Sequence, residues 1–278
     1  MSGTLYVVGT PIGNLQDFSP RALQTLADVD FIAAEDTRVT LKLLTHFGLK
    51  KPLVSYFEHN KASQGPVIVA RLASGESCAL VTDAGLPAIS DPGEALVRLC
   101  HQAGVPGVSV PGPSALTAAL SVSGMPSDHF YFEGFLSADK KERADRLQQL
   151  AAVPCTLLFY EAPHKLAATA QEMLRVFGDR PMAAVRELTK IHEEILPTTL
   201  AAFCDRLARQ EPRGEYVLIV QGAPVEANDD KQHTLQQALA LAARLQEEGL
   251  PPTKAAKIAA EFTGRKKGDV YAAMTGKD

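Results

Sequence analysis

Residues 78–93 read Cys-Ala-Leu-Val-Thr-Asp-Ala-Gly-Leu-Pro-Ala-Ile-Ser-Asp-Pro-Gly. The apolar run at 78–81 has the length and composition of a buried strand. The segment 83–93 holds two glycines, two prolines, two aspartates and a serine, and Asp91-Pro92 opens a helical pattern that runs to Ala103. A strand, a long loop and a helix in this order predict a βα unit whose loop binds a ligand at the carboxyl end of the strand.

The same alternation continues on both sides of this unit and predicts a largely parallel, Rossmann-like sheet. Ser19 is expected to cap the first helix and Thr37 the second, and Gly65-Pro66 is expected to delay the start of the third. Further strands are predicted at 5–8, 31–34, 53–56 and 105–110, and helices at 21–27, 38–47 and 93–103.

A second α/β series follows, and its last strands lie so close together in the sequence that we expect a mixed sheet. Its strands are predicted at 130–133, 156–160, 182–186, 192–196 and 216–221, and its helices at 140–150, 164–177 and 200–209. The predicted domains are therefore 1–117 and 118–223. A polar linker at 223–232 precedes a small helical domain, 233–278, whose three short helices at 235–247, 253–263 and 268–274 resemble a helix-turn-helix.

Charge and composition narrow the class of protein. Of the 278 residues, 46% are hydrophobic and 22% are charged, which is ordinary for a globular chain with two cores. The net charge of −4 argues against a uniformly basic nucleic-acid binder, yet residues 231–278 hold eight Lys/Arg and five Asp/Glu. A basic tail on an acidic body indicates that the tail would meet a polyanion, but charge alone favours the simpler explanation of a solvated helical surface.

Neither a membrane helix nor a signal peptide is expected, because no apolar run is long enough and the N-terminus leads straight into a strand. The four cysteines are scattered, which suits a reducing cytoplasm. The seven histidines show no His-x-x-x-His spacing, so the sequence offers no support for a metal site. These features predict a cytoplasmic protein that does not bind a membrane.

Three more loops at predicted strand ends are rich in Gly, Pro and small polar residues. Gly9–Asn14 has glycines that let backbone approach a ligand, but two glycines four apart also suit a plain tight turn. Pro111–Ala115 exposes N–H groups at a helix start, where Ser114 could equally be a simple cap. Phe159–Lys165 could close a cleft from the second domain, or could simply start a helix at Pro163.

Two charged clusters complete the set of candidates. Glu35–Arg38 ends the second strand, where dinucleotide-binding folds hold a ribose, so an NAD enzyme is a weaker alternative. Arg186–Glu194 is expected on a strand pair that would place Glu187, Thr189, Ile191 and Glu193 on one face. A solvated sheet edge is the usual explanation for such a run.

Together these loops resemble the tetrapyrrole-methylase superfamily and, more closely, the bacterial ribosomal RNA small-subunit methyltransferase I family. The resemblance spans nearly the whole body and includes the helical tail. Gly85-Leu86-Pro87 stands where corrin-making relatives have Gly-Asp-Pro, which argues against the corrin branch. The matching segments, in order, are Gly9–Leu15, Ala34–Arg38, Asp83–Gly93, Pro111–Ala115, Phe159–Lys165 and Arg186–Glu194.

This resemblance implies two α/β domains with S-adenosylmethionine (SAM) folded into the cleft between them, and a homodimer. It implies 2′-O-methylation of the ribose of one cytidine in 16S rRNA, with the assembled small ribosomal subunit as partner. By carry-over, the cofactor contacts would come from Pro11, Gly85, Leu86, Pro87, Ala88, Ile89, Ser114, Ala115, Phe159 and Tyr160.

Methyl transfer to a ribose hydroxyl needs in-line alignment and an acceptor for the hydroxyl proton. A lysine of lowered pKa or a carboxylate could take the proton, and the candidates are Lys190, Glu187 and Asp36. Arg38 and Lys42 are expected to hold substrate phosphates. In the tail, phosphate contacts are expected from Lys254, Lys257, Arg265, Lys266 and Lys267.

Two other functions stay open at this point. A tetrapyrrole methyltransferase would need an open apolar trough and would leave the helical tail without a role. A nucleotide-binding or RNA-binding module without catalytic activity would leave the proline-rich loops unexplained.

Overall fold

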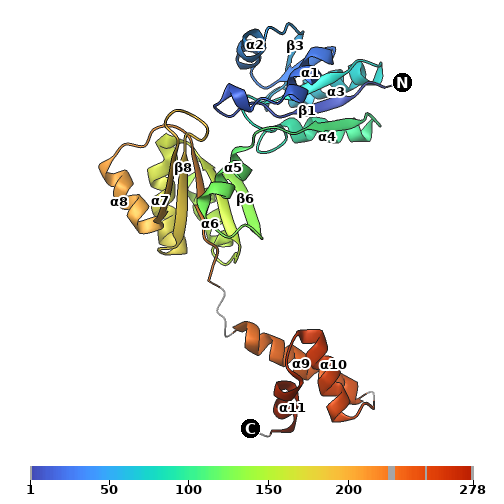
Figure 1. The fold of residues 1–278 in the computed structure, drawn as a ribbon, viewed down its shortest axis with the longest axis vertical. Helices are drawn as coiled ribbons and strands as arrows, with labels where there is room; N and C mark the ends of the chain where they lie inside the picture. Colours follow the sequence, from blue (N-terminus) through green and yellow to red (C-terminus); the bar gives the residue numbers. More distant parts are fainter. Residues whose placement is uncertain (1, 225–228, 248, 277–278) are drawn as a thin grey trace. The chain divides into compact units, whose positions relative to one another are not determined.

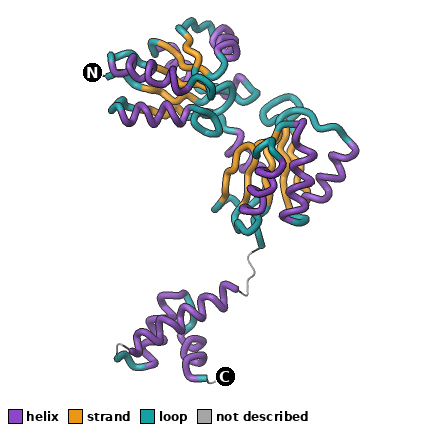
Figure 2. Tube along the Cα trace, turned by 180° about the vertical axis from the view of Figure 1, so that it is seen from behind, coloured by secondary structure: helices purple, strands orange, loops and turns teal. Residues whose placement is uncertain are grey.

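Residues 2–224, 229–247 and 249–276 are described by a computed structural model of the chain. The chain divides into two units, Met1–Ala223 and Pro224–Asp278, and the first unit contains two α/β halves. Figures 1 and 2 show a sheet with helices beside it in each half, and helices alone in the second unit. Within the described ranges, no helix is long and apolar enough to cross a membrane.

The first half is built on a five-stranded parallel sheet with the order β3-β2-β4-β1-β5. The three strands β4, β1 and β5 are neighbours, so the loops that follow them leave the sheet side by side at its carboxyl edge. The strands are β1 (Leu5–Val8), β2 (Phe31–Ala34), β3 (Leu53–Ser55), β4 (Cys78–Val81) and β5 (Gly107–Val110).

Helices cover both faces of this sheet, which explains why β2 and β4 are buried along their whole length. One face packs on α1 (Pro20–Asp28) and α2 (Thr37–His46), and a short 3₁₀ turn at Leu15–Asp17 precedes α1. The other face packs on α3 (Lys61–Ala73) and α4 (Gly93–Gln102).

Two local predictions in this half are wrong. The cap of α2 is Asp36, whose carboxylate accepts from the backbone N–H of Arg38 at 2.8 Å, so Thr37 is already helical. The helix α3 begins at Lys61 and includes Pro66. The adjacent Gly65 packs tightly against α4: a Cβ there would lie 2.7 Å from Cδ1 of Leu99, so packing between the two helices holds this part of α3 in place.

The second half contains a mixed sheet with the order β6-β7-β10-β8-β9, in which only β6 and β7 run parallel. Three helices cover one face of it: α6 (Lys140–Leu150), α7 (Pro163–Phe177) and α8 (Leu200–Arg209). The strands are β6 (Phe130–Phe135), β7 (Thr156–Glu161), β8 (Pro181–Arg186), β9 (Glu194–Thr199) and β10 (Tyr216–Val220).

The helix α5 (Ala115–Ser123) follows the first sheet in sequence but packs on the second one. Ala119 and Leu120 of α5 are buried against Leu158, Val217 and Ile219 of the second sheet. In Figure 1, α5 lies against the second sheet, where it contacts β10, β8 and β9. By packing, the division between the halves therefore lies at the start of α5, and the N-terminal end of this helix lies at the junction.

The second unit consists of α9 (Asp229–Glu247), α10 (Pro252–Thr263) and α11 (Lys267–Thr275). Its core is built from small residues, with Ala238, Ala242, Ala255, Ala259 and Val270 fully buried. Small side chains let the helices approach closely, which suits a domain of this size. The predicted linker at 223–232 lies partly outside the described residues, and α9 already begins at Asp229.

A buried ion pair in the second half offers a test of the fold. The Nε of Arg143 donates to Glu172 at 2.9 Å, and the two side chains are only 10% and 8% exposed. Glu172→Gln leaves the guanidinium with an uncompensated charge and is expected to cost about 3 kcal/mol of unfolding free energy in urea titrations. The control Glu94→Gln breaks the exposed pair with Arg98 and should cost no more than about 0.5 kcal/mol. Equal losses in the two variants would contradict the packing described.

Candidate functional site

Three loops interlock at the carboxyl edge of the first sheet. Gly9 after β1 and Gly112 after β5 touch through their backbones: a Cβ on Gly9 would lie 2.7 Å from the Cα of Gly112. Thr10 and Gly85 exchange backbone hydrogen bonds of 2.9 and 3.2 Å, which joins the loop after β1 to the loop after β4. Gly9 and Gly112 are therefore required because no side chain fits between these two loops, and Gly85 is favoured by its φ of +92°.

The loop after β4 is held in an unusual conformation. Ala88 and Ser90 have φ angles of +68° and +66°, which are costly for residues with a Cβ. The Asp91 carboxylate compensates by accepting from the N–H groups of Ala88 at 2.9 Å, Ile89 at 3.2 Å and Gly93 at 2.7 Å. Backbone strain supported by a dedicated side chain is typical of a ligand-binding loop.

A cavity of about 390 Å³ opens between these loops and the second sheet. Its volume lies in the range of small-molecule sites, and its lining is mostly apolar with a few polar groups. Lining residues from the first half include Ile12, Glu35, Thr82, Asp83, Ala84, Gly85, Leu86, Ile89, Ser90 and Asp91. Ser114 and Ala115 line it at the start of α5, and the second half adds Phe135, Tyr160, Glu161, Ala162, Val185, Leu188, Lys190, Glu215, Tyr216 and Val217.

Tyr160 and Ser114 bring the two halves together at this cavity. Burial raises the pKa of the Tyr160 hydroxyl, while hydrogen bonding with the Leu116 backbone and the Ser114 side chain acts in the opposite direction. Ser114 occupies the cap position of α5 but makes no side-chain capping bond, so the simple-cap explanation of this serine is wrong. Because no side chain caps α5, the backbone N–H groups at its start suit an anionic group such as a carboxylate.

The loop between β8 and β9 reaches the cavity from the second half. The predicted strand pair at 186–194 is wrong here, because 187–193 form a turn in which Glu187 and Thr189 have φ angles of +50° and +66°. The loop packs on Gly13: a Cβ there would lie 2.5 Å from Cγ of Lys190. Ile191 at its tip is 96% exposed.

Lys190 lines the cavity as a cation held by two carboxylates. Its Nζ donates to Glu187 at 2.9 Å and to Glu215 at 3.0 Å. Burial lowers the pKa of Lys190, but these two hydrogen bonds outweigh it and the pKa is raised overall. The expectation of a lysine with lowered pKa is therefore wrong. The hydrogen bond from Lys190 also lowers the pKa of Glu187, which makes that carboxylate a weak proton acceptor.

Asp36 and Arg38 form an exposed pair beside the cavity, with 2.6 Å between Nη2 and Oδ2. Hydrogen bonds from Arg38 hold the pKa of Asp36 at about 2. Asp83 has the opposite property: partial desolvation raises its pKa although the residue is exposed, and the nearby carboxylates of Glu35 and Asp36 act in the same direction. Asp83 is the better proton acceptor of the two, and residue spacing alone did not identify it.

A second hollow of about 460 Å³ adjoins the first, and the two share Thr82 and Asp83. It lies against α2 and is lined by Pro11, Lys42 and His46 among others. Lys42 is exposed, and Arg38 lies one turn before it on the same helix. This hollow therefore has a basic border suited to an anionic substrate.

Only some of the residues predicted to contact the cofactor line the cavity. Six of them line the cavity, namely Gly85, Leu86, Ile89, Ser114, Ala115 and Tyr160, whereas Pro11 lines the adjoining hollow. Phe159 is fully buried in the core of the second half, so its side chain cannot reach a ligand. Pro87 and Ala88 belong to the strained loop but are not among the lining residues.

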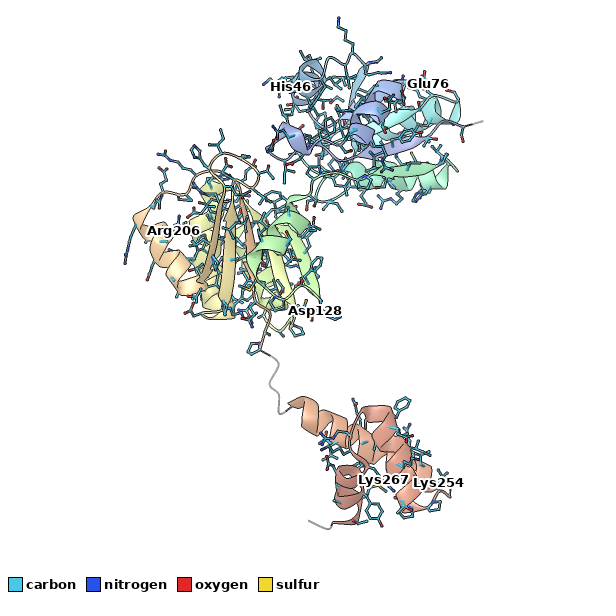
Figure 3. The ribbon with its side chains drawn as sticks, in the orientation of Figure 1. His46, Glu76, Asp128, Arg206, Lys254 and Lys267 are labelled. Atoms are coloured by element: carbon cyan, nitrogen blue, oxygen red, sulfur yellow. The ribbon has the colours of Figure 1, made fainter. Side chains whose placement is uncertain are left out.

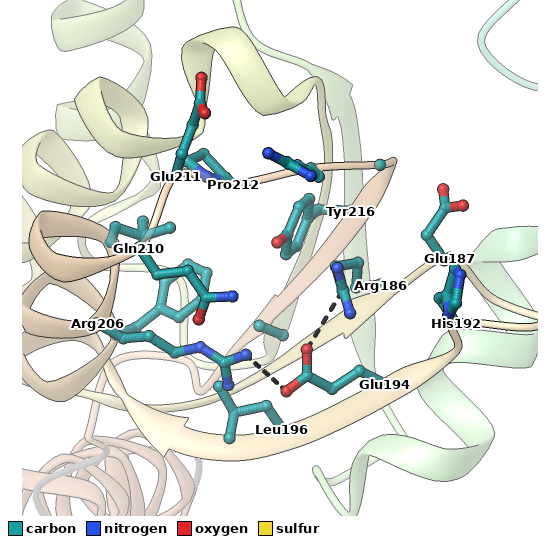
Figure 4. Close-up of a pocket in the computed structure, with 15 residues that line it drawn as sticks. Arg186, Glu187, His192, Glu194, Leu196, Arg206, Gln210, Glu211, Pro212 and Tyr216 are labelled. Atoms are coloured by element: carbon teal, nitrogen blue, oxygen red, sulfur yellow. Dashed lines mark hydrogen bonds and ion pairs between the residues drawn. The ribbon is translucent and has the colours of Figure 1, made fainter.

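A further cavity of about 480 Å³ lies on the other side of the second sheet (Figure 4). Glu194 lies between Arg186 and Arg206 and pairs with both, at 3.2 and 2.6 Å. The three charges tie β9 to α8, so a structural role explains them. Of the described residues, no group of three His, Cys, Asp or Glu side chains is arranged to hold a metal ion.

Comparisons with known proteins agree with this geometry. The family model for Tetrapyrrole (Corrin/Porphyrin) Methylases matches residues 4–204, and the model for the RsmI C-terminal HTH domain matches residues 233–276. A ribosomal RNA small subunit methyltransferase I of Xylella fastidiosa is 50% identical over 97% of this chain and 98% of its own. The proteins of that name from Pseudomonas aeruginosa and Haemophilus influenzae are 46% and 44% identical, over 97% and 98% of this chain and 96% of their own chains.

The chain belongs to the ribosomal RNA small subunit methyltransferase I family. Its α/β fold is that of the tetrapyrrole-methylase superfamily. Uroporphyrin-III C-methyl transferase from Thermus thermophilus, solved with S-adenyl homocysteine, has a TM-score of 0.56 and 21% identity over 79% of this chain and 97% of its own. Diphthine synthase has a TM-score of 0.61 and 14% identity, over 79% of this chain and 90% of its own.

Gly9→Ala tests whether the loop contact shapes the cofactor site of this family member. The added methyl would collide with Gly112, so the loops must separate, and we expect SAM affinity in calorimetry to fall at least about tenfold. The control Gly107→Ala meets only a His101 atom at 4.0 Å and should bind as the unmodified protein does. Unchanged SAM affinity in Gly9→Ala would show that the loop contact does not shape the site.

Proposed function

We propose that this chain transfers the methyl group of SAM to the ribose 2′-oxygen of cytidine 1402 of 16S rRNA. The single observation that carries the proposal is the cavity built from strand-end loops of both halves, next to a hollow with a basic border. Family membership supports a methyltransferase that uses SAM and acts on small-subunit rRNA. The proposal goes beyond family membership in naming the ribose 2′-oxygen as the acceptor and cytidine 1402 as the nucleotide.

The residues around the cavity fit SAM. SAM is a zwitterion with an adenine and supplies a methyl group carried on a sulfonium centre. The uncapped N–H groups at the start of α5 suit its carboxylate, and the backbone around Gly85 is open to close approach. Apolar walls from Ile12, Leu86 and Val217 suit a planar base.

The adjoining hollow is the proposed place for the target nucleotide. Thr82 and Asp83 form the wall that it shares with the cofactor cavity. Arg38 and Lys42 would hold the phosphates on either side of the target ribose. The Asp36 carboxylate fixes the guanidinium of Arg38, so Asp36 acts as a positioning residue rather than as a base.

Asp83 is the proposed acceptor of the 2′-hydroxyl proton, and Lys190 is the proposed cation that stabilises the developing negative charge on the oxygen. Glu187 fixes Lys190 in place. The assignment rests on position, because Asp83 lines both the cofactor cavity and the adjoining hollow and Lys190 lines the cavity. The raised pKa of Asp83 and the raised pKa of Lys190 agree with these roles.

An RNA substrate explains the second unit better than a tetrapyrrole does. The match to residues 233–276 is to a tail domain named for the rRNA family. A tetrapyrrole substrate would leave the exposed lysines of this unit, such as Lys254 and Lys267 in Figure 3, without a partner. The proposal also includes a homodimer in the cytoplasm, as the family resemblance implies, and sedimentation of the purified chain tests the dimer.

The direct experiment uses SAM labelled in its methyl group and small subunits from a strain that lacks this chain. The label should appear in 16S rRNA at one cytidine and survive on the ribose after the base is removed. Label on a base, on ribosomal protein or on an added tetrapyrrole instead would exclude the proposed reaction.

Asp83→Asn keeps an oxygen that can accept from the backbone N–H of Asp36 but removes the proton acceptor. In the unmodified protein, the rate should fall as pH drops through the Asp83 pKa, which partial desolvation raises above its usual range. In the variant, turnover should fall about 100-fold or more and the acid limb of the pH profile should disappear. An unchanged pH profile in the variant would remove Asp83 from the mechanism.

Lys190→Ala removes the cation at the cavity wall. We expect turnover to fall about 100-fold or more, as for the loss of a donor to a developing anion, while SAM affinity changes much less. The matched control Glu215→Gln weakens one partner of Lys190 at an 81% exposed side chain and should change turnover by no more than about threefold. If Lys190→Ala weakens SAM binding and leaves turnover intact, Lys190 is a cofactor ligand only.

A further inference from the structure

The side chain of Phe262 is exposed on the outer face of α10. We define this outer face by the residues Lys254, Lys257, Ile258, Glu261 and Phe262. Phe262 is 84% exposed, and Ile258, one turn earlier, is 38% exposed. The inner face of α10 consists of alanines that are buried in the core of the second unit. The two apolar side chains of the outer face therefore play no part in the core of this unit.

Basic residues lie on the same helix as these two apolar residues and directly after it. Lys254, Ile258 and Phe262 are spaced four residues apart and form one stripe along the helix. Gly264, with a φ of +67°, ends α10 and turns the chain so that Arg265, Lys266 and Lys267 follow at once.

Little on this face neutralises that charge. Residues 252–275 contain five Lys/Arg and only two Asp/Glu. Lys257 and Glu261 approach no closer than 3.8 Å, at side chains 62% and 68% exposed, so this pair is weak. The Nε of Arg265 is buried and has no hydrogen-bond partner within the described residues.

We propose that the outer face of α10 binds an unpaired stretch of RNA, with Phe262 stacked on a base and the surrounding lysines on the backbone phosphates. The chemistry favours this occupant because single-stranded RNA presents aromatic base faces and a regular row of negative charges together. An apolar protein partner would use Phe262 and Ile258 but not the basic residues around them. The proposal rests on the proposed function, since it names the part of the chain that holds the rRNA substrate.

The chain contains no tryptophan, so Phe262→Trp introduces a single fluorescent reporter on this face. A single-stranded oligocytidylate should quench its emission, and the quenching should weaken as salt rises. The matched control is Val67→Trp, at a 52% exposed position on α3, whose emission the same RNA should leave unchanged. Absence of quenching at 262, or emission that is already blue-shifted without RNA and does not respond to it, would overturn the proposal.

Methyl transfer to small subunits gives the second readout. Phe262→Ala and Phe262→Leu should raise KM for the subunits about tenfold, the value of one lost base stack, while kcat stays the same. Phe262→Trp should keep the original KM. If Phe262→Leu behaves as the unmodified protein, the face binds an apolar protein surface and the stacking proposal fails.

The two hypotheses fail in different ways. A chain that methylates no subunits but shows quenching at position 262 would refute the proposed reaction and keep the RNA face. A chain that methylates subunits equally well with phenylalanine, leucine or alanine at 262 would keep the reaction and refute the face. Because the side chain is exposed, all four forms should unfold at the same temperature.

Discussion

The site depends on one close approach between two stretches of backbone. Gly9 and Gly112 leave adjacent parallel strands and touch without side chains between them, and Thr10 binds Gly85 of the next loop through two backbone hydrogen bonds. This contact fixes three loops as one surface at the carboxyl edge of the first sheet. It also positions the start of α5, which continues from the third loop into the second half of the unit.

The two halves of the first unit contribute different chemistry to this surface. The first half supplies backbone groups, acidic side chains and the strained loop that Asp91 supports. The second half supplies aromatic and apolar walls and a lysine held between two carboxylates. The positive charge that RNA phosphates require lies mostly outside the cavity, on α2 and in the second unit. In the proposed function, α2 would therefore hold the phosphates beside the target ribose, and the second unit would hold RNA away from the cavity.

The sequence alone predicted most elements, because buried parallel strands are short apolar runs and each helix begins and ends at local signals. It also predicted the loops at Asp83–Gly93 and Pro111–Ala115, because glycines, prolines and small polar residues gather there at the ends of strands. It did not predict the strand order, which decides that β4, β1 and β5 are neighbours. Lys190 and Glu215 are far apart in sequence and meet only through the pairing of β8 with β10. The alternating pattern predicts a strand at Glu187 and Thr189, because nothing in residues other than glycine signals their left-handed backbone.

The central claim is that loops from both halves close on one SAM molecule. Hydrogen exchange of backbone amides, measured with and without SAM, tests it most directly. The account predicts that SAM slows exchange together in residues 9–13, 84–91, 114–116, 160–162 and 188–190. Protection confined to the loops of the first sheet, with the segments around Tyr160 and Lys190 exchanging as before, would contradict it.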